Sequence, residues 1–323
     1  MMDDAKASDD VLDIERDDTR WAPPEGTARH SGDPIEPGAD FFVEPPPEIG
    51  ELVSAETTLS AKTRPWRTVS RIVLAGLIGW GAALILDVIL VHNNQVNAKE
   101  NLVWEALLLL GFAPLTWYFT RFSHTCSFVG KLGIARYRCK GNRDRLAAPE
   151  VFFFGDATEL RTSQTRHYYN HIYTGTAYTF TWTDGEGSKW FKLKGTYRGE
   201  NSLPKAKDPF HFALMSEGAW SVFLFDQVVA ELEANQSVRF SLGGKHFIAI
   251  GPGFLDVFVS GTEPERLTVD EIDGMQADAG VIKIKRIDAQ EGWFSSKGVY
   301  KFNYEQMANS RLFLLLYTQL IGK

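Results

Sequence analysis

The stretch Ile72–Val91 reads IVLAGLIGWGAALILDVILV, and the stretch Leu102–Phe119 reads LVWEALLLLGFAPLTWYF. At about 1.5 Å per residue, a helix over the first stretch reaches roughly the 30 Å of a bilayer's hydrocarbon core. The second stretch ends in Trp117 and Tyr118, which suit a membrane interface. The sequence therefore predicts a transmembrane helical hairpin over residues 72–120. The alternative is a buried helical hairpin, but no comparably apolar helices elsewhere could cover both stretches.

Charge is distributed unevenly along the chain. Residues 1–60 hold 16 acidic and 4 basic residues, whereas the remainder carries a net charge of +5 within a total of −7. The juxtamembrane segment 61–71 and the region after the second apolar stretch are both basic. Because positive charge near membrane ends stays in the cytoplasm, we expect a multi-pass protein of the cytoplasmic (inner) membrane with both termini cytoplasmic.

The first 60 residues resemble a disordered tail. They contain seven of the fourteen prolines, many acidic residues and no periodic apolar pattern. Such a segment cannot offset its conformational entropy by burial, so we expect it to be unfolded. No apolar segment lies near Met1, which argues against a cleaved signal peptide.

Small residues recur every four positions in the first apolar stretch. Ala75, Gly79 and Ala83 form a small-xxx-small pattern, which lets helices approach closely. The packing partner could be the second apolar stretch or another copy of the chain. Homo-oligomer formation through this helix is therefore an open expectation.

Two cysteines, Cys126 and Cys139, are too few for a disulfide scaffold and are not spaced like a zinc motif. Two reduced thiols are the simplest interpretation. A bridge across a hairpin that turns near Gly130–Gly133 is the alternative, and the sequence leaves it open.

From Phe122 onward the pattern predicts an α+β region. Thr176–Thr183 alternates apolar and polar residues as a half-buried antiparallel strand does. Asp208 and Pro209 then open an apolar helix, and a second set of short strands ends in a helix over Asn309–Ile321. We therefore expect two units, 122–234 and 235–323, each a strongly bent antiparallel sheet closed by a C-terminal helix.

This order of elements resembles the pleckstrin-homology-like (PH-like) superfold, and a membrane hairpin before two such units resembles bacterial PH-like membrane proteins. The second unit carries the resemblance most clearly, in Leu267–Ile272, Gly292–Phe294, Tyr300–Phe302 and Met307–Leu316. The resemblance implies a binding or scaffolding function. It supplies no catalytic residues.

The densest polar patch reads RTSQTRHYYNHIY over Arg161–Tyr173, and its candidate ligand contacts are Arg166, His167, Tyr168 and His171. Histidines four apart can hold a metal on a helix, but the surrounding residues favour extended structure, where that spacing has no such meaning. A ligand-contacting loop and a half-exposed strand pair are the other interpretations. No nucleotide-binding, hydrolase or zinc motif occurs, so we predict no catalytic residue, no cofactor and no metal.

Aromatic and basic residues also gather in the second unit. The candidate lipid or partner contacts are Lys283, Lys285, Arg286, Trp293, Phe294, Lys297 and Lys301. On a tethered domain such residues could touch anionic lipid headgroups. The leading hypothesis is thus a membrane-anchored scaffold whose partners are the lipid bilayer and an unidentified protein, with no nucleic acid. A membrane-bound enzyme with an unrecognised site in the first unit is the alternative.

Overall fold

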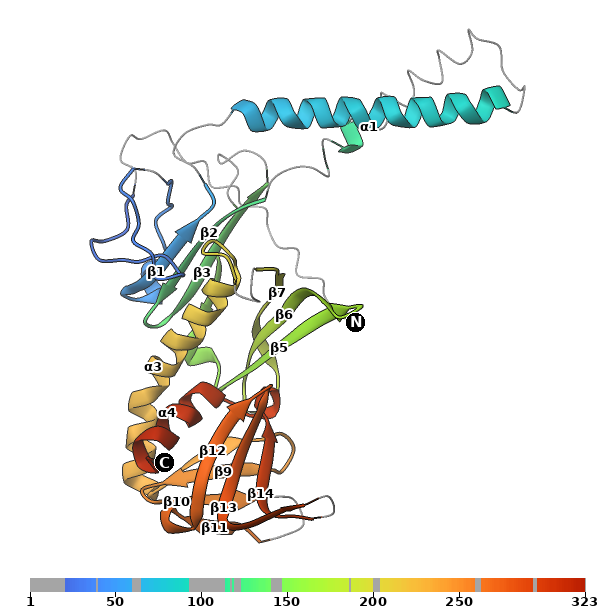
Figure 1. Cartoon of the computed structure of the whole chain (residues 1–323). Coiled ribbons are helices and arrows are strands. Elements are labelled where there is room, and N and C mark those ends of the chain that lie inside the picture. The colour runs from blue at the N-terminus through green and yellow to red at the C-terminus, as the bar shows by residue number, and fades with distance from the viewer. Residues whose placement is uncertain are drawn as a thin grey trace, which may run out of the picture.

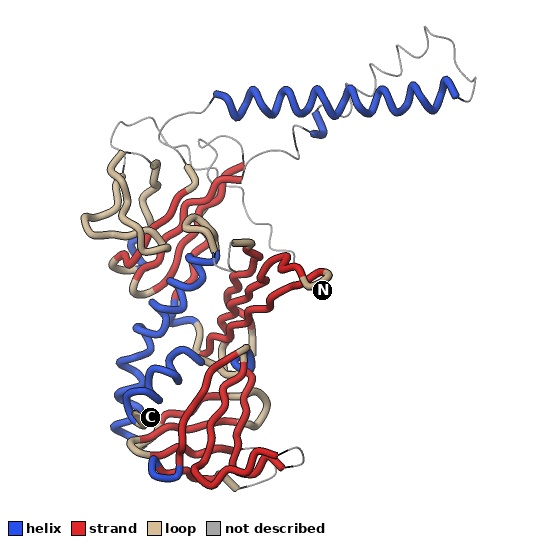
Figure 2. The backbone as a smooth tube through the Cα atoms, in the orientation of Figure 1, coloured by secondary structure: helices blue, strands red, loops and turns tan. Residues whose placement is uncertain are grey.

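The computed structural model describes residues 21–38, 40–59, 65–92, 114–116, 118, 123–140, 147–185, 187–199, 204–258, 263–292 and 295–322. Within these residues the fold is mainly β, with four antiparallel sheets and few helices (Figures 1 and 2). The strands form two successive sets, and one helix follows each set. We call these sets, with their helices, the first and the second module.

The first module contains a four-stranded sheet, a three-stranded sheet and a long helix. The four-stranded sheet runs in the order β1 (Leu52–Thr57), β2 (Ser123–Gly130), β3 (Gly133–Lys140) and β4 (Glu150–Phe153). The three-stranded sheet is a meander of β5 (Glu159–Tyr169), β6 (Ile172–Thr183) and β7 (Lys189–Tyr197), and α3 (Phe210–Asn235) follows it. Short 3-10 helices, η1 (Pro47–Ile49) and η3 (Phe154–Asp156), flank the first sheet.

The second module repeats this order in a shorter form. Its four-stranded sheet contains β8 (Val238–Ser241), β9 (Phe247–Gly251), β10 (Phe254–Phe258) and β11 (Glu265–Thr268). Its three-stranded sheet contains β12 (Ile272–Asp278), β13 (Val281–Gly292) and β14 (Ser295–Asn303), followed by α4 (Ser310–Leu320). The short helices η5 (Val269–Glu271) and η6 (Tyr304–Gln306) precede β12 and α4 respectively.

Strand β6 follows directly from its sequence pattern. Tyr178, Phe180 and Trp182 are buried, and all of them project from the same face because side chains alternate along a strand. At the other end of the hairpin, Asn170 and His171 both adopt positive φ. Two such residues make the tight turn whose twist matches paired strands, so β5 and β6 are joined directly.

A single hydrophobic core runs through both modules. It includes Phe152 and Trp182, whose rings lie 5.5 Å apart and join the two sheets of the first module. Helix α3 contacts β2, β3 and β7 of the first module and β8 and α4 of the second. Figure 1 shows α3 running along both modules. The helix is therefore part of the core of both, and the two modules form one body.

The predicted disordered tail is wrong for residues 21–59. Strand β1 lies in this segment and pairs with β2, and Phe42 and Ile49 are buried in a second apolar cluster with Phe128. His30 and Arg29 are buried as well. A few well-placed aromatic residues anchor a segment that its overall composition assigns to disorder. Residues 1–20 lie outside the described residues.

The predicted transmembrane hairpin, and with it the inner-membrane localisation with cytoplasmic termini, is contradicted. No helix within the described ranges has the length and apolar composition needed to cross a bilayer. Helix α1 spans Pro65–His92 and includes the first predicted stretch. Of the second predicted span, only residues 114–116 and 118 are described.

Candidate functional site

One asparagine joins the two modules. Asn309 lies directly before α4, and its side-chain oxygen accepts hydrogen bonds from the Leu160 backbone N–H (2.9 Å) and from the Trp220 indole N–H (2.9 Å). Its side-chain N–H donates to the Thr158 carbonyl (3.1 Å), and its backbone N–H donates to the Leu160 carbonyl (2.8 Å). Asn309 thus connects α4 to β5 and α3 by four hydrogen bonds.

Other polar contacts accompany this joint. The Ala308 backbone N–H donates to the Ser241 carbonyl (2.8 Å), and the Arg161 guanidinium donates to the Ser241 hydroxyl (3.3 Å). Arg161 also pairs with Glu159 at 2.9 Å. These contacts tie the start of β5 to the second module, and they leave the rest of β5 to diverge from it.

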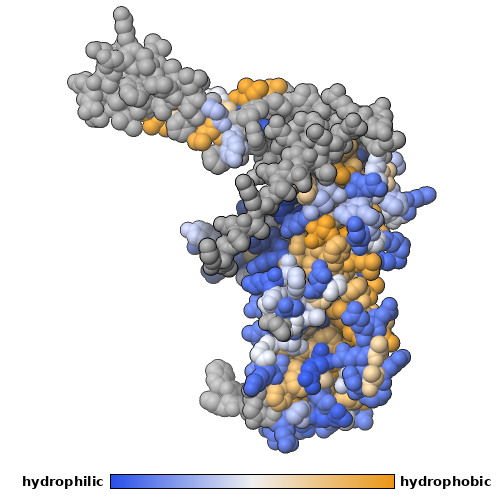
Figure 3. Space-filling model, turned by 180° about the vertical axis from the view of Figure 1, so that it is seen from behind, coloured by the Kyte–Doolittle hydropathy of each residue, from blue (hydrophilic) through white to orange (hydrophobic). Residues whose placement is uncertain are grey.

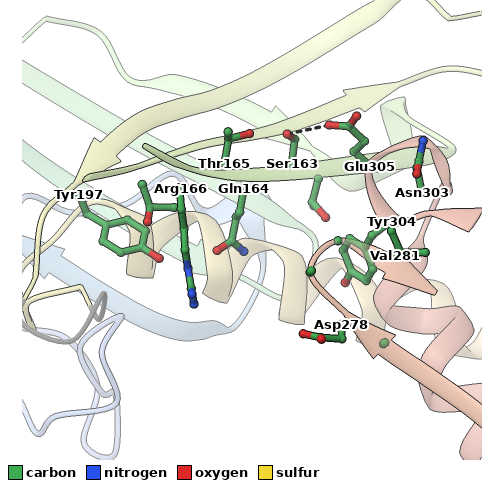
Figure 4. A pocket seen from close by; sticks show the side chains of 15 residues that line it. Ser163, Gln164, Thr165, Arg166, Tyr197, Asp278, Val281, Asn303, Tyr304 and Glu305 are labelled. Atoms are coloured by element: carbon green, nitrogen blue, oxygen red, sulfur yellow. Dashed lines mark hydrogen bonds between the residues drawn. The ribbon is translucent and has the colours of Figure 1, made fainter. Parts of the chain in front are cut away.

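A polar cleft of about 810 Å³ opens where β5 diverges. One wall consists of residues 162–166 with Thr176 and Tyr197, all from the first module. The opposite wall consists of residues 277–281 and 303–305, from the β12–β13 turn and the end of β14 with η6. The cleft is therefore built by both modules and depends on how they are joined (Figure 4).

The cleft carries charges of both signs. Arg166 projects from β5, while Asp278 and Glu305 lie on the second module (Figure 4). The Ser163 hydroxyl donates a hydrogen bond of 3.1 Å to the Glu305 carboxylate, which bridges the two walls. A serine that donates to a carboxylate, without a histidine beside it, is not an activated nucleophile of the usual kind.

A buried carboxyl lies behind the cleft, between α3 and α4. The side chain of Glu217 is 8% exposed, and its closest basic group is the Arg311 guanidinium at 3.8 Å. Burial raises the pKa of Glu217 to about 7, and Arg311 only partly opposes this rise. Its charge state therefore changes near neutral pH at the contact between the two helices.

A second buried polar group lies in the first module. The His30 ring is held between the hydroxyls of Ser54 (2.8 Å) and Ser127 (3.0 Å), and it packs 5.0 Å from the Phe212 ring. Burial, and secondarily His211, lowers the pKa of His30 to about 3. A neutral, fully enclosed histidine of this kind fastens residues 21–59 to the sheet, and substrates cannot reach it.

The structure separates the predicted polar patch into two parts. Arg166 lines the cleft, whereas His167, Tyr168 and His171 lie at the exposed tip of the β5–β6 hairpin. Tyr168 is 58% exposed and packs edge-on against Tyr173. The two histidines are on a hairpin rather than on a helix. The described residues contain no group of three or more His, Cys, Asp or Glu side chains that could hold a metal.

The predicted basic surface of the second module is partly assembled. Lys283 and Lys301 lie opposite each other in the register of β13 and β14, and Lys285 lies two residues farther along β13. All three lysines therefore share one face of the sheet. Arg286 instead pairs with Glu265 at 3.0 Å and Asp288 at 2.9 Å. Lys297 is exposed and lies opposite Gln290 in the register of β13 and β14. Trp293 and Phe294 lie outside the described residues.

The small-residue stripe lies partly on a covered side of α1. Ala75 is 6% exposed and Gly79 is buried, whereas their neighbours Leu74 and Leu77 are exposed. The side chain of Ala83 lies outside the described residues. The two cysteines are buried on adjacent strands and form no disulfide bridge in the described structure.

An apolar band follows α3 on the face shown in Figure 3. Its exposed members are Val222, Phe225 and Val229 on α3 and Leu315 on α4. On a helix these spacings place the three α3 residues on one side. The band and the cleft are separate features of the molecular surface.

The predicted polar patch Arg161–Tyr173 contains residues 162–166 of one cleft wall, but the sequence did not identify the opposite wall. Asn309 was recognised only as the start of the last helix, and no sequence signal marked Ser163, Glu305 or the β12–β13 turn as their neighbours. Asn309 adopts a left-handed conformation, with positive φ, next to the start of α4. Asn tolerates positive φ better than most residues, so an Asn directly before a predicted helix was the one available hint. No protein-family model matches the chain, and no curated protein matches it either.

Proposed function

We propose that this protein is a non-catalytic binding protein, built from two PH-like modules, that holds part of a partner protein in the cleft between the modules. The cleft itself is the observation that carries the proposal. Its volume is about 810 Å³, and both modules contribute to its walls. Its lining is rich in hydroxyl, amide and backbone groups, which recognise a polypeptide by hydrogen bonds.

The PH-like assignment rests on the order of elements. Each module has four antiparallel strands, then three, then one helix whose buried residues enter the core. Function cannot be assigned from such an architecture alone, because one fold supports many activities. The absence of a paired acid, base and nucleophile in the described cleft favours binding over catalysis.

Site-specific photocrosslinking tests this function. A benzoylphenylalanine at Gln164, in the cleft, should crosslink to a partner protein, whereas the same group at Glu231, exposed on α3, should not. Ala277→Trp, which fills the cleft, should abolish the crosslink, and Ala230→Trp on α3 should preserve it. Equal crosslinking from both positions, or crosslinking that survives Ala277→Trp, would contradict the proposal.

A second candidate is contact with anionic lipid headgroups through Lys283, Lys285 and Lys301. The supporting observation is that these three lysines share one face of β13 and β14. Near an anionic surface each contributes about 1 kcal/mol, and salt screens this attraction. The chain should then bind phosphatidylserine vesicles at low salt and lose most binding in the Lys283→Gln, Lys301→Gln variant. Lack of binding by the wild-type chain at low salt would rule this candidate out.

A further inference from the structure

Strand β5 is an edge of its sheet, because the order is β5–β6–β7. An edge strand presents backbone N–H and C=O groups to one side, and such groups pair readily with another extended chain. The β5 edge faces the cleft, because residues 162–166 form one of its walls. The ligand-facing groups of the cleft therefore include main-chain groups as well as side chains.

The direction of these groups follows from Leu160. Both its N–H and its C=O are hydrogen-bonded to Asn309, so both point away from β6. Backbone groups in a strand alternate direction from one residue to the next, and β5 pairs with β6 without a register shift as far as His167. Thr162, Gln164 and Arg166 therefore also direct their N–H and C=O groups away from β6.

None of these three residues has a main-chain partner on that side among the described residues. The hydrogen bonds along this edge end at Leu160, where Asn309 imitates one residue of a neighbouring strand. Figure 4 shows Gln164 and Arg166 projecting to one side of β5 and Ser163 and Thr165 to the other, as the alternation requires. Thr162 is buried, so the accessible part of the edge begins at Gln164.

We infer that the exposed β5 edge from Gln164 to Arg166 binds an extended, unstructured segment of a partner protein as an additional strand. This inference rests on the proposed function and specifies how the cleft is used. The open edge runs about 7 Å along β5, at about 3.3 Å per residue. Main-chain hydrogen bonds supply the affinity in this mode, and side-chain contacts supply specificity.

A single strand suits this cleft better than a second copy of the protein. The β12–β13 turn and the end of β14 form the opposite wall, so the edge is accessible only from within the cleft. A folded sheet from another copy would have to displace that wall. Ser163 and Glu305 already bridge the walls near the Asn309 joint, which leaves Gln164 and Arg166 as the open part of the edge.

The test uses peptides selected by the full chain from a displayed library of random ten-residue sequences. Gln164→Pro removes the N–H that faces the cleft, and β5 should tolerate it because proline is accepted on edge strands. Gln164→Ala is the matched control, since it removes the side chain and keeps the N–H. We expect Gln164→Pro to weaken peptide binding about tenfold and Gln164→Ala to change it less than threefold.

Amide hydrogen exchange of the wild-type chain, followed by NMR, gives an independent result if Gln164→Pro does not fold. Peptide binding should slow exchange at the exposed Gln164 and Arg166, and leave Ser163 and Thr165 unchanged because they already pair with β6. Protection without this alternation, or equal peptide affinity of folded Gln164→Pro, would overturn strand addition. Self-association of the chain that Gln164→Pro abolishes would also overturn it, in favour of a second copy.

The two proposals fail separately. If the library yields no binding peptide, or the exchange pattern is wrong, while the crosslink from Gln164 remains sensitive to Ala277→Trp, strand addition is wrong and the cleft still binds a protein. If that crosslink is absent, the proposed function itself fails.

Discussion

The two modules protect the outer faces of their four-stranded sheets in different ways. In the first module, residues 21–59 cover the sheet with a separate apolar cluster that contains Phe42, Ile49 and Phe128. In the second module, two arginines cover aromatic rings: the Arg239 guanidinium lies 4.0 Å from the Phe247 ring centre, and that of Arg266 lies 4.0 Å from the Phe254 ring centre. The same architecture thus accepts either an apolar layer or amphipathic side chains as cover.

The difference also explains how the first module tolerates a long insertion. Strands β1 and β2 are neighbours in the sheet although α1 and its flanking residues separate them in the chain. The entropic cost of closing a loop grows only slowly with its length, so a few ladder bonds and a covered sheet face can hold β1 in place. The shorter second module has no comparable interruption between its strands.

The largest expected effect comes from breaking the apolar cover. Phe128 is fully buried and meets the rings of Trp21, Phe42 and Tyr137. Phe128→Ala should lower the free energy of unfolding by about 3–5 kcal/mol, because it leaves a cavity in a packed cluster. Denaturant unfolding measures the loss, and limited proteolysis should show faster cleavage within residues 21–50.

The matched change in the second module is Phe247→Ala. This ring is only partly buried and lies between Arg239 and Phe258. Its removal should cost only about 1–2 kcal/mol. Equal losses for Phe128→Ala and Phe247→Ala would show that the two covers are energetically equivalent and that the comparison is wrong.

The next effect concerns the joint that makes the two modules one body. Asn309→Gly keeps the positive φ of this position but leaves the Trp220 indole N–H and the Leu160 N–H without their acceptor. We expect a loss of about 2–4 kcal/mol, because buried donors are left unpaired. Small-angle scattering should also report greater separation of the modules. An unchanged melting temperature and scattering profile would show that the shared core alone joins them.

The last expected effect concerns pH. The pKa of Glu217 is raised to about 7 in the folded protein, against an ordinary value of 4.5, so the folded state holds a proton that the unfolded state has lost between these values. Stability should therefore fall as pH rises through this window. Glu217→Gln should remove that fall and raise stability at pH 8 by on the order of 2 kcal/mol. Glu231→Gln, on the exposed side of α3, is the control, and identical pH profiles for wild type and Glu217→Gln would contradict the assignment.

Local structure was largely readable from the sequence. The alternation in Thr176–Thr183 predicted strand β6, and Tyr178, Phe180 and Trp182 are buried as expected. Asp208 and Pro209 predicted the start of α3, and the Asp208 carboxylate accepts a hydrogen bond from the Phe210 N–H at 2.9 Å. Helix α3 continues through Gly218 as one helix and packs on elements of both modules.

Composition and hydropathy were less reliable guides. The acidic, proline-rich composition of residues 1–60 predicted disorder, yet β1 and the buried His30 belong to the first module. The apolar stretch 72–91 predicted a membrane span, which the described residues do not support. Averages over a segment cannot reveal which few side chains find a partner sheet, because the partner strands follow after residue 122.

The sequence by itself determined strand β6 and the two closing helices, since these depend on alternation and capping residues that lie within a few positions of one another. Only the tertiary structure decided that β5 has a free edge, that Asn309 pairs with Leu160, and that Glu217 is buried beside Arg311. The last two of these features join residues about 90–150 positions apart. Such contacts depend on how finished elements pack against each other, and no local pattern encodes that packing.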